Sequence, residues 1–158
     1  MNEGHELMEA VCREFPDKKA PHKLVEKFIE SLREEKVEVE RPTNFAAKNF
    51  VGRKKNTVAI LAQAHESTKI DRWGVSKQII DRIIDKKILW GIALINGDCR
   101  GFWIPGENFP ELTKLKIVAL GKRSKNEKYS FNRSTLENSN LVFGFFTVTK
   151  FIQISGLE

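Results

Sequence analysis

The sequence has few cysteines and histidines, and it has no long apolar run. Cys12 and Cys99 stand far apart among 158 residues and neither belongs to a CxxC motif, so they predict separate thiols rather than a disulfide framework. His5, His22 and His65 lack the spacing of zinc ligands. No segment approaches the roughly 18 apolar residues of a membrane span, and the acidic N-terminus is not a secretory signal. We therefore expect a cytoplasmic protein with no membrane partner, metal or cofactor.

Familiar catalytic motifs are also missing. The stretch "NFVGRKKNT" (49–57) has one glycine and lacks the GK[ST] order of a Walker loop, and the chain has no GxSxG or HExxH motif. A metal-dependent nuclease of the PD-(D/E)XK type needs clustered carboxylates and a lysine on adjacent strands. The candidate pair, Glu66 and Lys69, has two intervening residues instead of one. We expect no enzymatic activity and keep the nuclease as an alternative.

Positive charge is concentrated in one part of the chain. Residues 1–40 contain seven Lys/Arg and eleven Asp/Glu, whereas residues 41–158 contain twenty Lys/Arg and ten Asp/Glu, a net charge of +10. Such asymmetry favours a polyanionic partner for the second part. The alternative is a solvated, lysine-rich surface without a partner.

The first forty residues predict two helices. Apolar residues repeat every four positions over 5–15. Pro21 suits the first turn of the second helix, which has one apolar stripe. Its members are Leu24, Val25, Phe28, Ile29 and Leu32. Alternating Val37 and Val39 follow, before Pro42.

From residue 43 onward the pattern is typical of strands. Short apolar or alternating runs predict strands at 57–64, 88–95, 100–105, 114–122 and 147–155, and either a strand or an extended edge at 129–135. The turn at Asn96-Gly97-Asp98 joins two of them as a hairpin. One helix lies among the strands, at 76–87, with Ser76 as its N-cap.

One internal helix is too few for a doubly wound α/β fold. We therefore predict an α+β protein, built as a small curled β-barrel with mixed or antiparallel strands, N-terminal helices and one internal helix. Residues 43–156 would form this barrel and bind nucleic acid, and residues 1–40 would be a helical extension. The chain would be part of, or associated with, a larger motor or nuclease assembly.

Aromatic residues are interleaved with basic ones in the second part. Aromatic faces can stack an unpaired base while Lys and Arg hold phosphates. Trp90 lies inside an apolar run and predicts core packing, whereas Phe102 and Trp103 face opposite sides of their strand. Trp73 precedes a helix and follows Arg72, so we predict a pocket wall there. The predicted phosphate contacts are Arg53, Lys54, Lys55, Lys69, Arg72, Lys77, Lys122, Arg123, Lys125, Lys128 and Arg133.

Residues 57–121 resemble the first half of EVE and YTH domains, which have the PUA-like fold. The resemblance rests on "RWGVSK", with Trp73, Gly74, Val75 and Lys77, and on "ILWGIALING" returning as "CRGFWIP". It implies a reader that holds one extruded, modified base, for instance a methylated one, in an aromatic cage. Such domains also target McrB-type restriction complexes.

The resemblance implies a base pocket in this chain. Trp73 would be the first wall, and the base edge would meet Gly74 and the loop from Gln63 through His65 to Ser67. The second wall would come from Trp103, Tyr129 or Phe131, which the sequence does not distinguish. The function expected is therefore a DNA reader that flips a base; the alternatives are a site-specific B3-like domain, an RNA-binding PUA-like domain and the nuclease.

Overall fold

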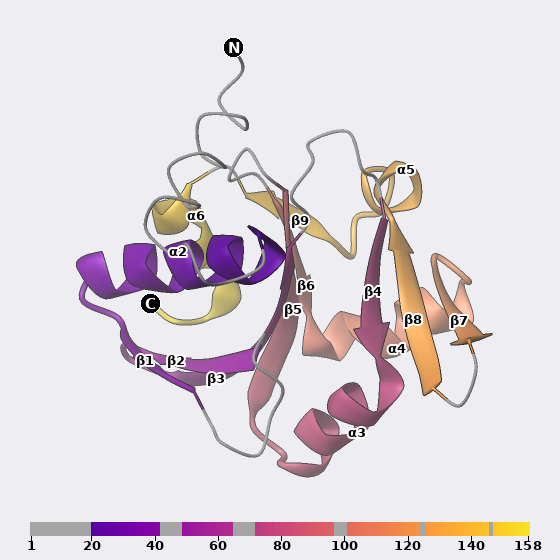
Figure 1. Cartoon of the computed structure of the whole chain (residues 1–158), viewed down its shortest axis with the longest axis horizontal. Coiled ribbons are helices and arrows are strands. Elements are labelled where there is room, and N and C mark those ends of the chain that lie inside the picture. Colours follow the sequence, from indigo (N-terminus) through magenta and orange to yellow (C-terminus); the bar gives the residue numbers. More distant parts are fainter. Residues whose placement is uncertain (1–19, 42–48, 65–71, 97–100, 124–125, 146) are drawn as a thin grey trace.

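The computed structural model describes residues 20–41, 49–64, 72–96, 101–123, 126–145 and 147–158 of the chain. Two β-sheets and several helices form its described part (Figure 1). The predicted helix at 5–15 lies outside the described residues. No helix in the described part is both long enough and apolar enough to cross a bilayer.

The larger sheet has six strands in the order β1-β2-β3-β5-β6-β9. Their bounds are β1 Glu38–Glu40, β2 Asn49–Arg53, β3 Thr57–Ala64, β5 Leu89–Ile95, β6 Gly101–Pro105 and β9 Phe143–Phe145. Only β3 and β5 run parallel, with Val58 opposite Leu89 and Ala64 opposite Ile95; the other neighbours are antiparallel. A parallel pair needs a crossover, and the segment between β3 and β5 supplies it.

The second sheet has three antiparallel strands in the order β4-β8-β7. Their bounds are β4 Arg72–Ser76, β8 Asn126–Asn132 and β7 Val118–Arg123. Helix α3 (Lys77–Asp85) follows β4 directly. Its buried residues, Ile80 and Ile83, pack in a core that residues of both sheets share. Figure 1 shows α3 at one end of β4 and the short α5 (Arg133–Leu136) at the other.

The six-stranded sheet separates two hydrophobic cores because side chains alternate along each strand. On one face, Val58, Ile60 and Ala62 of β3 pack with α2 (Ala20–Glu34) and α6 (Val148–Ser155). On the other face, Ala59 and Leu61 pack with α3, with α4 (Phe109–Lys114) and with the second sheet. The 3-10 turn η1 (Gly106–Asn108) leads from β6 into α4.

The α+β class is confirmed, but the closed barrel is not. The sheets are two separate layers, and the larger one ends in β1 on one edge and in β9 on the other. Strand β1 pairs with β2, and α2 shares a core with β3. Residues 20–41 therefore belong to the same packed unit as the described residues from position 49 onward.

Most predicted elements have their predicted type. The strand at 57–64 and the strand ending at Ile95 are present, and the helix expected at 76–87 spans Lys77–Asp85. Ser76 precedes that helix without making a side-chain cap hydrogen bond. The strand predicted at 114–122 begins only at Val118, because Leu115 and Lys116 close helix α4.

The strand predicted at 147–155 is wrong, because Val148–Ser155 form helix α6. The Thr147 hydroxyl accepts a hydrogen bond from the Lys150 amide at 3.0 Å, and Gly156 ends the helix in the left-handed region with φ 85°. These are an N-cap and a C-terminal glycine. Thr147 and Gly156 are local helix-end signals, and here they outweigh the alternation of apolar residues between them.

Candidate nucleic-acid interface

The outer face of the β4-β8-β7 sheet presents exposed basic side chains among small ones. Trp73, Val75, Tyr129 and Phe131 point inward to the core. The alternate residues therefore point outward. Those with described side chains are Arg72, Gly74, Ser76, Ala119, Gly121, Lys128, Ser130 and Asn132.

This outer face is positively charged and has small side chains. Of its described side chains, Arg72 and Lys128 are charged, both are exposed, and neither faces a carboxylate on the same face. The Arg72 Nε donates to Asn132 Oδ1 at 3.1 Å, which holds the guanidinium along the sheet. An added Cβ at Gly74 or Gly121 would meet its nearest neighbour at 3.9 Å, so the space above both glycines is open.

The predicted phosphate contacts do not share one surface. Lys54 and Lys55 are exposed in the β2–β3 turn of the other sheet, next to Arg53, which is paired with Glu40 at 2.8 Å. Lys77 is paired with Asp81 at 2.8 Å, and the hydrogen bond and charge of Asp81 raise the pKa of Lys77. Lys69 and Lys125 lie outside the described residues, as do the side chains of Lys122 and Arg123. Arg72, Lys128 and Arg133 remain near the second sheet.

Trp73 does not form an open pocket wall. Its side chain is 2% exposed, and its indole Nε1 donates to the Ile95 carbonyl at 3.3 Å. The ring packs edge-on against Phe102, with centroids 6.0 Å apart. Trp73 therefore joins the second sheet to the end of β5.

The other predicted cage residues are also dispersed. Trp103 is 1% exposed and lies in the core with α6, on the opposite face of the six-stranded sheet from Trp73. Tyr129 is half-buried and packs edge-on against Phe109 at 4.9 Å. Phe131 is fully buried. The sequence could not decide these positions, because strand alternation fixes opposite faces without telling which face is covered.

The remaining predicted pocket residues give no cage either. Gly74 is half-buried in β4, paired with Ser130 of β8, and Gln63 is half-buried near the end of β3. His65 and Ser67 lie outside the described residues, as do Glu66 and Lys69 of the nuclease alternative. Within the described part of the chain, no three His, Cys, Asp or Glu side chains gather as metal ligands.

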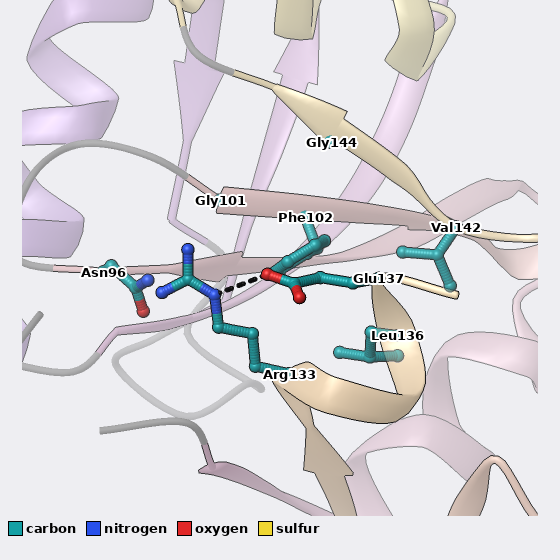
Figure 2. Close-up of a pocket in the computed structure, with 8 residues that line it drawn as sticks. All are labelled: Asn96, Gly101, Phe102, Arg133, Leu136, Glu137, Val142 and Gly144. Atoms are coloured by element: carbon teal, nitrogen blue, oxygen red, sulfur yellow. Dashed lines mark hydrogen bonds and ion pairs between the residues drawn. The ribbon is translucent and has the colours of Figure 1, made fainter. Parts of the chain in front are cut away.

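A pocket that sequence reasoning missed lies where α5 meets β5, β6 and β9 (Figure 2). Its volume is about 220 Å³, and its lining residues are Asn96, Gly101, Phe102, Arg133, Leu136, Glu137, Val142 and Gly144. Arg133 was predicted as a phosphate contact, but its Nε donates to Glu137 at 2.8 Å. The turn signal at Asn96 marked this place in the sequence without indicating that the side chain is buried.

Comparison with known proteins gives little guidance. No protein-family model and no curated protein matches the chain. Among solved structures, a nuclease from a fusselovirus is similar at 14% identity, with 71% of this chain and 78% of that chain covered and a TM-score of 0.43. A likeness this distant carries no argument about fold or activity.

Proposed function

We propose that this chain is a nucleic-acid-binding module that contacts phosphates with the outer face of the β4-β8-β7 sheet. The observation that carries the proposal is the composition of this face: Arg72 and Lys128 are exposed among small side chains, with no described carboxylate. Lysine and arginine provide the salt-dependent part of nucleic-acid affinity. Small residues let a backbone approach the sheet closely.

One further basic side chain lies beside this face. Arg133 follows Asn132 directly, and it is paired with Glu137 at 2.8 Å. Reading of a flipped, modified DNA base for a restriction complex remains the finer form of the proposal. A relationship to EVE and YTH domains is a separate hypothesis. The phosphate contacts proposed for this face do not depend on whether the chain is related to those domains.

The test is a salt titration of binding to fluorescent 20-mer DNA, single-stranded and double-stranded, and to a matched RNA. We expect affinity that falls linearly with the logarithm of salt concentration, as counterion release requires. Absence of binding to all three probes at 50 mM salt would overturn the proposal. Incubation with plasmid and Mg²⁺ is the parallel test of the nuclease alternative, because cleavage would contradict a module that only binds.

A further inference from the structure

The pocket beside α5 contains one buried acceptor atom that has no partner among the described residues. Asn96 is 1% exposed, and its Oδ1 has no hydrogen-bond partner within the described residues. A buried hydrogen-bonding atom without a partner costs about 1–3 kcal/mol, and native proteins rarely keep one without a reason. Asn96 also lines the pocket, so a bound molecule could supply the missing donor.

The pocket offers apolar surfaces beside this amide. Phe102 is half-buried and is supported from behind by Trp73, at 6.0 Å and 76° between ring planes. Leu136 and Val142 line the pocket from α5 and from the segment before β9. Figure 2 shows Phe102 between Asn96 on one side and these two aliphatic side chains on the other. A ring that enters would therefore touch an aromatic face and aliphatic groups.

An ion pair adds both donors and acceptors at the same pocket. The Arg133 Nε donates to Glu137 Oε1 at 2.8 Å, and both side chains are partly exposed, at 30% and 51%. Figure 2 shows the Arg133 guanidinium projecting toward the Asn96 carboxamide. The Nε bond leaves the terminal amino groups of Arg133 as donors, since a guanidinium carries five N–H groups. Glu137 provides acceptors.

The size of the pocket limits what can enter. About 220 Å³ is below the roughly 300–1,000 Å³ of sites for drug-sized ligands. A single heteroaromatic ring system suits this volume. A molecule that satisfies Asn96, Arg133 and Glu137 together must carry donors and acceptors on the edge of such a ring.

We propose that this pocket binds one unpaired nucleobase, stacked on Phe102 and hydrogen-bonded to Asn96. The ligand is either a free nucleotide or a base extruded from a strand. Binding of a base extruded from a nucleic-acid strand rests on the proposed function. Arg72 bonds Asn132, which precedes Arg133 in the chain, so the basic face continues to the pocket.

Gly144 allows the pocket to be filled without disturbing the core. Gly144 pairs with Phe102 across β6 and β9, so a side chain there points to the same face as Phe102. An added Cβ at Gly144 meets no atom within 4 Å. Gly144→Val should therefore fold and occupy the pocket. Asn96→Ala removes the amide, and Asn138→Ala, on the exposed side of the α5 turn, is the matched control.

The experiment compares a fluorescent single-stranded 12-mer of mixed sequence with an abasic 12-mer of the same charge, using the full chain. We expect the wild type to bind the base-bearing strand at least about 5-fold tighter, the lower end of one base–aromatic stack. Gly144→Val and Asn96→Ala should lose this preference and keep their affinity for the abasic strand, whereas Asn138→Ala should keep both. Circular dichroism confirms that each variant is folded.

A second arm titrates the four deoxynucleoside monophosphates and follows the Asn96 side-chain amide by NMR. A saturable shift of the Asn96 amide signal in the wild type, absent in Gly144→Val, supports a base-binding pocket. If the base-bearing and abasic strands also bind equally, the ligand of the pocket is a free nucleotide. Equal binding of both strands with no shift overturns the pocket and leaves phosphate binding intact. If neither strand binds, the proposed function fails. In that case, a saturable shift of the Asn96 amide signal with nucleotides supports the pocket, and the absence of a shift overturns it.

Discussion

The indole Nε1 of Trp73 donates a hydrogen bond to the carbonyl oxygen of Ile95, 3.3 Å away across the space between the two sheets. Trp73 is the second residue of β4 in the smaller sheet, and Ile95 is the last residue of β5, which pairs in parallel with β3 in the larger sheet. The two sheets share no ladder hydrogen bond in the described part of the chain. This bond and the packing around it therefore align one sheet on the other.

Replacing Trp73 by Phe should reduce stability rather than binding. The change removes the hydrogen bond and part of a buried ring, and each loss costs about 1 kcal/mol or more. We expect the free energy of unfolding, measured by urea denaturation, to fall by about 2 kcal/mol. DNA affinity measured on the folded protein should stay within about 2-fold. A large loss of affinity with unchanged stability would restore Trp73 as a pocket wall.

Lys128→Glu should weaken nucleic-acid binding at low salt. Lys128 is exposed at the centre of the outer face, opposite Ser76 and Gly121. Loss of one phosphate contact lowers the slope of log affinity against log salt by about 1, which a fluorescence titration at several salt concentrations measures. Lys36→Glu is the control, because Lys36 is exposed after α2 on the other side of the six-stranded sheet. An equal effect of both changes would indicate a general charge effect instead of this face.

Gly91→Ala should destabilise the protein through overpacking. A Cβ at this position would lie 2.3 Å from the Trp103 ring and 2.8 Å from the Ile104 carbonyl oxygen. Such insertions cost typically 1–3 kcal/mol or more, so the melting temperature should fall by several degrees. The control is Gly121→Ala, whose Cβ would have its nearest neighbour at 3.9 Å. A melting temperature of Gly91→Ala equal to that of the wild type would contradict close packing of Trp103 on Gly91.

Leu157→Ala should destabilise the protein although the residue is next to last in the chain. Leu157 is 0% exposed, and its side chain lies over Gly52, where an added Cβ would meet it at 3.0 Å. Truncating a buried leucine costs about 2–5 kcal/mol, which chemical denaturation would show. Glu158→Ala, at an exposed position, should leave the unfolding free energy unchanged within about 0.5 kcal/mol. Equal stability of Leu157→Ala and the wild type would mean that this end of the chain does not pack.

The candidate site was harder to predict than the fold. Arg72, Lys128 and Arg133 were recognisable as basic residues, but the sequence did not separate them from Lys54 and Lys55 on the other sheet. The sequence around Asn96 predicts a turn, whereas the burial of its side chain depends on α5 and β9, which come more than thirty residues later. Contacts between such distant segments leave no local pattern in the sequence.

The sequence by itself determined where the chain forms β3, β5 and α3, because hydrophobic periodicity is a local property with a period of two or 3.6 residues. It also determined that Phe102 and Trp103 face opposite sides. Only the tertiary structure decided which side each core occupies, that β3 pairs with β5, and that Trp73 is buried while Asn96 lines a pocket. The physical reason is that burial depends on what packs against a residue, and those partners come from distant parts of the chain.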